Sequence, residues 1–167
     1  EAVAALIGKS GIPVVASASH DTASAVAGIP MTGEGSLWLS SGTWSIMGIE
    51  AAEPVKTPQA LASGFCNELG VDRSVRFLKN ISGLWLIQEC KRQWEHEGKS
   101  FDYASMAAMA EEAEPFTAFV DPDDALFASP GGMPGKIQAW CEKSGQPVPQ
   151  TPGAILRVAT ESLALKY

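Results

Sequence analysis

The sequence contains little of what metal sites and disulfide frameworks need. It has two histidines and three cysteines in 167 residues, and no C-x-x-C pair. Cys66, Cys90 and Cys141 are widely spaced and odd in number, so we expect neither a zinc site nor a disulfide framework. Unpaired cysteines are typical of a reducing compartment, which predicts a cytoplasmic location.

Positive charge and long apolar runs are also scarce. Twelve Lys and Arg stand against nineteen Asp and Glu, and the basic residues form no long run. Binding to the phosphate backbone of nucleic acid needs a positive surface, so we do not expect a nucleic-acid partner. No apolar run approaches the roughly 20 residues of a spanning helix, and no signal peptide opens the chain, so we expect no membrane either.

Both ends of the sequence show helical patterns. Residues 1–11 have the character of the last turns of a helix that ends at a glycine. Residues 152–167 have a helical apolar spacing with no C-terminal cap or breaker after it. From these ends we expect the sequence to be a piece of a longer protein.

Strand patterns come first along the chain, and helical patterns dominate later. We predict strands at 13–18, 37–40 and 44–49, and two shorter ones at 65–69 and 74–78 that pair across residues 70–73. We predict helices at 21–28, 82–97, 103–113, 134–144 and 152–167. Strands followed by helices, with at least one β-α unit, predict a layered α/β or α+β structure.

The helix predicted at 82–97 has the clearest amphipathic spacing. The stripe is predicted to follow a three-to-four spacing through Leu84, Trp85, Ile87 or Gln88, Lys91 and Trp94, with charge on the opposite face. Cys90, in the same segment, is predicted to be a small core residue.

Two glycine-rich segments imitate phosphate-binding loops, and both depart from the pattern. In "GIPMTGEG", Glu34 stands where the lysine of a phosphate loop belongs. In "PGGMPGKI", Pro130 and Ile137 replace the first glycine and the hydroxyl residue. We therefore interpret both segments as ordinary loops.

Two polar sites follow predicted strands. Asp21 comes after the 13–18 strand, where a carboxylate is either a helix N-cap or an acid/base group. The Ser41-Gly42-Thr43 segment is a tight hairpin turn that also offers backbone N–H groups and a hydroxyl to phosphate oxygens. Ligands of α/β proteins gather at the carboxyl ends of strands, so the two sites together favour phosphoryl transfer to an alcohol.

Four segments of the sequence resemble the FGGY family of carbohydrate kinases. They are "ASHDTASAV", "LSSGTWSIMGIE", "RFLKNISGLWLIQECKRQW" and "QPVPQTPGAILRVATESLALKY". The similarity runs in one order over nearly the whole chain. The third segment favours the branch of the family that phosphorylates L-rhamnulose.

This resemblance implies an α/β chain with the actin-like ATPase (ribonuclease H-like) fold, incomplete here, with a mixed sheet and flanking helices. It implies that residues 1–30 are the end of an N-terminal sugar-binding domain and the hinge. Residues 31–167 then form the first part of a C-terminal nucleotide-binding domain. In this family the active site lies in the cleft between the two domains.

The resemblance also implies an activity, namely transfer of the γ-phosphoryl group of Mg-ATP to the 1-hydroxyl of L-rhamnulose. Asp21 takes the role of the catalytic base, and His20, Asp21, Thr22 and Asn80 contact the sugar. Thr43 and Gln88 contact ATP, and magnesium is held mainly through the nucleotide rather than by side chains. The remainder of the same polypeptide completes the cleft, so this chain alone is expected to be inactive.

Other interpretations stay open at this stage. The substrate could be another ketose or polyol, or the chain could be a non-catalytic α/β module that binds a sugar or a protein. In that case Asp21 is only a helix cap and His20 a satisfied polar residue at a strand end. Asn80 could cap the 82–97 helix, and Gln88 could belong to its solvated face.

Overall fold

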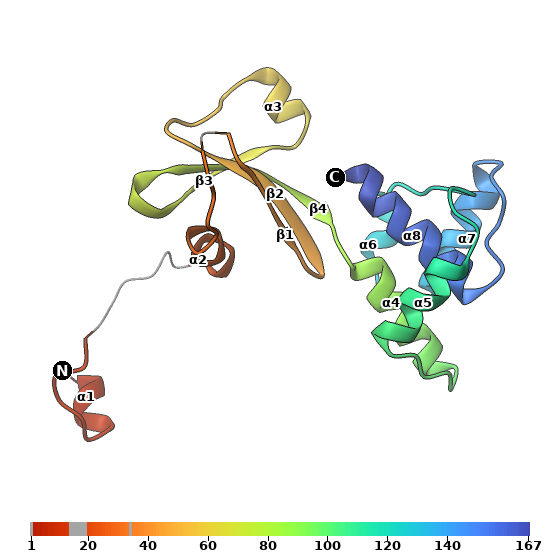
Figure 1. The fold of residues 1–167 in the computed structure, drawn as a ribbon, viewed down its shortest axis with the longest axis horizontal. Helices are drawn as coiled ribbons and strands as arrows, with labels where there is room; N and C mark the ends of the chain where they lie inside the picture. Colours follow the sequence, from red (N-terminus) through yellow and green to blue (C-terminus); the bar gives the residue numbers. More distant parts are fainter. Residues whose placement is uncertain (1, 14–19, 34) are drawn as a thin grey trace.

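A computed structural model describes residues 2–13, 20–33 and 35–167 of the chain. Figure 1 shows a sheet with short helices near it, and a bundle of helices that follows the last strand. The chain passes from the sheet to the bundle at residues 82–85. Strands followed by helices confirm the predicted α/β class.

The described sheet has four strands in the order β1-β2-β4-β3, and each pairs antiparallel with its neighbours. These strands are β1 (Leu37–Ser41), β2 (Trp44–Ala51), β3 (Cys66–Leu69) and β4 (Val75–Ser82). β1 and β2 form the predicted hairpin, and β3 and β4 form the second predicted pair. The strand predicted at 13–18 lies almost entirely outside the described residues.

One face of the sheet is covered by α2 (Asp21–Ala27). Val26 of this helix packs with Trp38 and Leu78, and all three are buried. Gly48 pairs with both Trp38 and Leu78 in the register. A Cβ at Gly48 would lie 2.8 Å from the Trp38 ring, so the absence of a side chain there makes room for the tryptophan.

Three further elements are short: one precedes the sheet in the sequence, and two lie between its strands. They are α1 (Ala2–Leu6), α3 (Pro58–Ala62) and the 3-10 turn η1 (Val71–Arg73). Thr57 caps α3 by accepting a hydrogen bond from the Ala60 amide at 3.1 Å. This is the usual way in which a hydroxyl satisfies a free N–H at the start of a helix.

The helices that follow β4 form the second part of the fold. They are α4 (Trp85–His96), α5 (Tyr103–Glu112), α6 (Ala125–Ala128), α7 (Met133–Lys143) and α8 (Pro152–Lys166). They enclose one apolar core, in which Leu86, Phe127, Ile137 and Leu156 are at most 1% exposed. α8 begins as predicted, with the Thr151 side chain accepting from the Ala154 amide at 3.2 Å.

The helix predicted at 82–97 differs from α4 in its start and in its buried face. Ser82, the first residue of the predicted helix, is instead the last residue of β4 and pairs with Trp44 of β2, so cross-strand pairing sets its conformation. The buried residues of α4 are Leu86, Glu89, Cys90 and Trp94. Leu84 is exposed, so its place in the predicted stripe was wrong. Trp85 and Ile87 pack against the core and Trp94 is buried, as predicted, and the predicted burial of Cys90 is confirmed.

Polar contacts join the sheet to the helical bundle. The Ser45 and Tyr167 hydroxyls are 2.5 Å apart, which links the start of β2 to the end of α8. The Ser82 amide donates to Asp123 Oδ1 at 2.7 Å. Lys166 Nζ lies 2.7 Å from Asp121 and 3.1 Å from Asp123, so the end of α8 is tied to the same loop.

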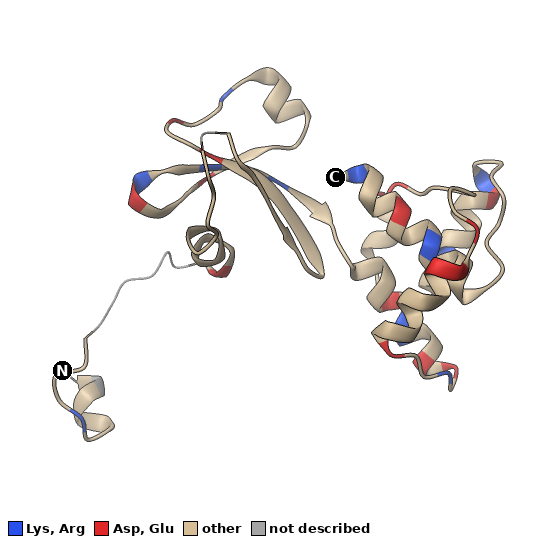
Figure 2. Ribbon diagram, viewed as in Figure 1, with Lys and Arg blue, Asp and Glu red and all other residues tan. Residues whose placement is uncertain are grey.

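Figure 2 shows that lysines and arginines are spread over the strands, loops and helices, with acidic residues between them. Two basic side chains, Arg76 and Arg157, pair with glutamates within the fold. Across residues 2–13, 20–33 and 35–167, no helix is both long enough and apolar enough to cross a membrane.

Candidate functional site

The first predicted site lies at the start of α2. Packing of Val26 against the sheet holds this helix. Thr22 and Ala23 in its first turn are also buried, whereas His20 and Asp21 are exposed. The Asp21 side chain is 96% exposed, and His20 Nδ1 lies 3.4 Å from its carboxylate. Asp21 Oδ1 accepts a hydrogen bond from the Thr22 amide at 2.7 Å. The carboxylate is therefore held locally and remains open to a ligand.

The predicted capping role of Asp21 needs a correction. The N-cap of α2 is His20, whose side chain makes no capping hydrogen bond, and Asp21 is the first helical residue. A cap accepts from an amide two or three residues further along, whereas Asp21 bonds the amide of its neighbour. Its carboxylate also sits at the positive end of the helix dipole, though in a helix this short that effect is small.

The second predicted site is the turn between β1 and β2, which contacts the start of α4. The Leu84 amide donates to the Gly42 carbonyl at 2.8 Å, and the Trp85 amide donates to the Thr43 carbonyl at 3.1 Å. The first amides of a helix have no partner inside the helix. The turn supplies partners for two of them, so its backbone is fixed to α4.

The turn offers fewer amide donors than we predicted. The Gly42 amide is already used, because it donates to the Trp44 carbonyl at 3.2 Å within the hairpin. Thr43 is exposed, and its hydroxyl makes no hydrogen bond to any described residue. The Thr43 amide likewise donates to no described residue, so the amide and the hydroxyl of Thr43 are the two groups that remain available to a phosphate oxygen.

Gln88 and Asn80 lie on elements next to this turn. Gln88 is half-buried on α4, and its backbone amide donates to the Leu84 carbonyl. It therefore lies one helical turn beyond Leu84, the residue whose amide contacts Gly42. Asn80 is exposed in β4, opposite Ile46. Alternation along the strand puts Asn80 on the face of Leu78, which α2 covers. Asn80 is not a helix cap, so that alternative was wrong.

The predicted residues do not form one closed pocket. Within the described part of the chain, no hydrogen bond or ion pair joins Asp21 to Asn80, Thr43 or Gln88. A groove of about 570 Å³ lies instead between α4, α5 and α8, where Met106 and Leu156 are among its lining residues. The sheet thus carries two separate polar sites, one at the start of α2 and one at the hairpin turn.

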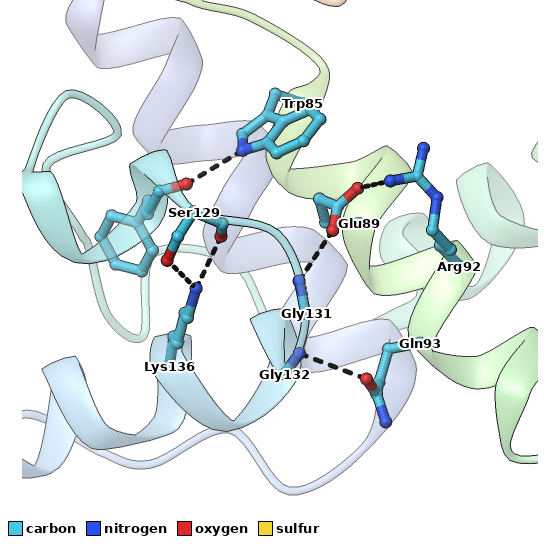
Figure 3. A network of polar contacts seen from close by, with 9 residues as sticks. Trp85, Glu89, Arg92, Gln93, Ser129, Gly131, Gly132 and Lys136 are labelled. Atoms are coloured by element: carbon cyan, nitrogen blue, oxygen red, sulfur yellow. Dashed lines mark hydrogen bonds and ion pairs between the residues drawn. The ribbon is translucent and has the colours of Figure 1, made fainter.

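The second phosphate-loop imitation is occupied by side chains of the protein itself (Figure 3). The Gly131 amide donates to Glu89 at 2.9 Å, and the Gly132 amide donates to Gln93 at 3.2 Å. Lys136 lies within α7, and its amine donates to the carbonyl and the hydroxyl of Ser129. The segment is therefore tied to α4 rather than open to a phosphate.

Glu89 is the central residue of this network. Its side chain is 1% exposed, and its second oxygen pairs with Arg92. We expect Glu89→Ala to lower the free energy of unfolding by about 1.5–3 kcal/mol, because the buried carboxylate loses its hydrogen bond from the Gly131 amide, and hydrogen bonds to charged groups are worth about this much. Arg92 is half exposed and can be solvated, so it adds little to the loss. Chemical denaturation would measure the change.

Glu89→Gln is the matched variant, since the amide oxygen can still accept from Gly131. It should cost less than Glu89→Ala. Glu95→Ala is the control, because Glu95 forms an exposed pair with Lys91 that contributes only tenths of a kcal/mol. Equal losses for Glu89→Ala and Glu95→Ala would contradict the role of Glu89.

Titratable groups outside the two sites have structural explanations. Burial raises the pKa of Cys90 to about 12, so this thiol stays protonated and is a poor nucleophile. The hydrogen bond from Lys166 lowers the pKa of Asp121, and the same bond raises the pKa of Lys166. These two groups remain charged at neutral pH and tie α8 to the loop beside β4.

Sequence reasoning missed Gly83 and Glu89. Gly83 is buried against the hairpin turn, and the signal for it was a glycine between a strand and a helix. Glu89 looked like a solvated residue because charges in helices are mostly exposed. The one hint was spacing: Glu89 lies three residues after Leu86 and three before Arg92, which places it at the border of the apolar stripe.

The chain resembles known rhamnulokinases along its whole length. A rhamnulokinase of Bacteroides thetaiotaomicron is 44% identical over 167 residues, which are 100% of this chain and 34% of that protein. One of Enterococcus faecalis is 43% identical over 150 residues, 90% of this chain and 30% of that protein. One of Oceanobacillus iheyensis is 45% identical over 154 residues, 92% of this chain and 32% of that protein.

The chain spans about a third of the length of these relatives. Residues 37–167 match the model of the C-terminal domain of the FGGY family of carbohydrate kinases. That range contains the described sheet and all of the helical bundle. This chain therefore belongs to the FGGY family of carbohydrate kinases and carries the actin-like fold of that family's C-terminal domain.

Proposed function

We propose that the chain is part of an ATP-dependent kinase that phosphorylates the 1-hydroxyl of L-rhamnulose. The observation that carries this proposal is the 44% identity to a rhamnulokinase over all 167 residues. The hairpin turn fixed to α4 supports it, because it presents a free hydroxyl beside the start of a helix. All three cysteines are free, which supports a cytoplasmic enzyme.

In this proposal residues 1–30 are the end of the sugar-binding domain and the hinge, and residues 31–167 begin the nucleotide-binding domain. The family match, which starts at residue 37, supports that boundary. Leu37, Leu39 and Leu69 are exposed on the sheet face opposite α2. Exposed apolar patches mark surfaces that contact other parts of a protein. The remainder of a polypeptide of the relatives' length would cover this face and complete the cleft.

Asp21 is the proposed base. As the sugar oxygen bonds to the γ-phosphorus of ATP, the bond from that phosphorus to the β,γ-bridging oxygen breaks and ADP leaves, while the sugar O–H bond breaks and its proton moves to the Asp21 carboxylate. Help of this kind is worth about 10²–10⁴ in rate. Thr22 donates to Asp21 from its amide and orients the carboxylate. His20, Thr22 and Asn80 are the proposed sugar contacts, and His20 is 56% exposed beside the carboxylate.

Thr43 and Gln88 are the proposed nucleotide contacts. The Thr43 hydroxyl can donate to a phosphate oxygen, because its backbone carbonyl is held by the Trp85 amide. Among the described residues, no group of three His, Cys, Asp or Glu side chains is placed to hold a metal ion. We therefore propose that magnesium is held mainly through the nucleotide. Mg-ATP supplies the phosphoryl group and neutralises its charge.

A coupled assay of ADP release tests this proposal. The full-length gene product should consume ATP with L-rhamnulose, and the 167-residue chain alone should not, because one wall of the cleft is absent. A panel of other ketoses and polyols tests the choice of sugar. Phosphorylation by the 167-residue chain would contradict its proposed inactivity. Failure of the full-length protein with every sugar would favour a non-catalytic binding module.

A further inference from the structure

The closest backbone approach at the hairpin turn is made at Gly83. A Cβ at this position would lie 2.4 Å from the Gly42 carbonyl oxygen. It would also lie 2.8 Å from the amide nitrogen of Ser45 and 2.8 Å from its hydroxyl. Two of these atoms belong to the backbone and cannot rotate away. Gly83 does not adopt a positive φ, so the space around it, and not its conformation, requires glycine.

Gly83 connects the end of β4 to the start of α4, directly beside the hairpin turn. It stands between Ser82, which pairs with Trp44, and Leu84, whose amide bonds the Gly42 carbonyl. Both sides of the turn are thus held by residues adjacent to Gly83. Any side chain at this position must push residues 42–45 away from α4 and lengthen the bonds from Leu84 and Trp85.

The surroundings leave the rest of the junction little freedom to adjust. Ser45 is fully buried, and its hydroxyl contacts Tyr167. The Trp85 indole donates to the Phe127 carbonyl at 2.9 Å, which anchors the start of α4 in the bundle. Because α4 cannot move back, the exposed part of the turn, Thr43, would take up the displacement.

We infer that Gly83 is a positioning residue for nucleotide binding, which sets where the Thr43 hydroxyl lies by letting the turn close on α4. This inference rests on the proposed kinase function. It assigns to Gly83 no contact with the nucleotide. Its effect reaches the ligand through Thr43, whose hydroxyl has no other partner among the described residues.

Gly83→Ala in the full-length gene product tests this inference. We expect the KM for ATP to rise about 10- to 100-fold, since a displacement near 1 Å can cost that much, while the KM for L-rhamnulose stays unchanged. In the 167-residue chain, the Leu84 and Trp85 amides should exchange with solvent at least about tenfold faster. Hydrogen exchange measured by NMR reports the junction independently of any activity.

A second variant covers the case in which Gly83→Ala does not fold. Leu84→Pro removes the amide that bonds Gly42, at a position whose φ of −68° already suits proline. It adds no side chain at residue 83. We expect the same direction of change in the KM for ATP, by a smaller factor.

Two glycines serve as matched controls. A Cβ at Gly153 would lie 2.3 Å from the Met109 carbonyl oxygen, so Gly153→Ala creates a similar collision between α5 and α8. It should lower stability and leave the KM for ATP unchanged. A Cβ at Gly135 meets nothing within 4 Å, and this residue lies within α7. Gly135→Ala should therefore raise stability slightly, because alanine favours the helix, and leave the KM for ATP unchanged.

The outcomes separate this inference from the proposed function. An active full-length protein whose KM for ATP is unaltered by Gly83→Ala and Leu84→Pro overturns the inference alone. A comparable rise with Gly153→Ala also overturns it, because the effect would then be general destabilisation. A full-length protein that neither binds nor uses ATP overturns the proposed function together with this inference.

Discussion

Replacing Asp21 with Asn in the full-length gene product is expected to lower kcat about 10²- to 10⁴-fold. Asparagine keeps the size of the side chain and can still accept the hydrogen bond from the Thr22 amide. It cannot take the proton that the sugar hydroxyl loses. The KM for ATP should change little, because Asp21 has no contact with Thr43 or Gln88 in the described structure. Steady-state kinetics with both substrates varied would measure these effects.

Asp21→Asn should change activity without changing stability. The Asp21 side chain is 96% exposed and is not the N-cap of α2, so the free energy of unfolding should change by less than about 0.5 kcal/mol. Asp102→Asn is the control, since Asp102 caps α5 and asparagine caps equally well. Near-normal kcat for Asp21→Asn would remove Asp21 from the mechanism and favour a purely structural carboxylate.

The local parts of the fold were predictable from the sequence. The hairpin around Gly42 and the second pair across residues 70–73 use short connections, whose residue types favour a chain reversal. The starts of the last two helices, α7 and α8, could be predicted from the prolines in their first turns and from the capping residue Thr151. The start of α4 was not predictable. The sequence pattern placed the helix start at Ser82, and only the pairing of Ser82 with Trp44 of β2 makes this residue part of the strand.

The candidate site was predictable in its residue types and not in its geometry. Asp21 and Thr43 stand out because polar groups follow apolar runs, which is a pattern of sequence. That the turn is fastened to α4 depends on Gly83, whose role comes from the absence of a side chain against distant backbone atoms. Likewise the carboxylate of Glu89 accepts its hydrogen bond from Gly131, more than forty positions away. Such contacts have no periodicity, so no pattern along the chain reveals them.

Phe127→Ala is expected to have the largest effect on stability, a loss of about 3–5 kcal/mol in the free energy of unfolding. Phe127 is 1% exposed and is among the largest fully buried side chains of the helical bundle. Its ring lies 5.7 Å from that of Trp140, and its carbonyl accepts from the Trp85 indole. Alanine would leave a cavity between α4, α6 and α7. A loss of this size is a large part of the roughly 5–15 kcal/mol that stabilises a typical domain.

Urea denaturation of the 167-residue chain measures this loss, and Phe116→Ala is the matched control. Phe116 is 69% exposed, so the same truncation should change the free energy of unfolding by about 0.5 kcal/mol or less. The difference between the two variants isolates burial from the chemistry of the ring. Because Phe127 also anchors Trp85, a stable Phe127→Ala protein should show faster hydrogen exchange at the Trp85 indole. Equal stability of the two variants would mean that the bundle does not form its core around Phe127.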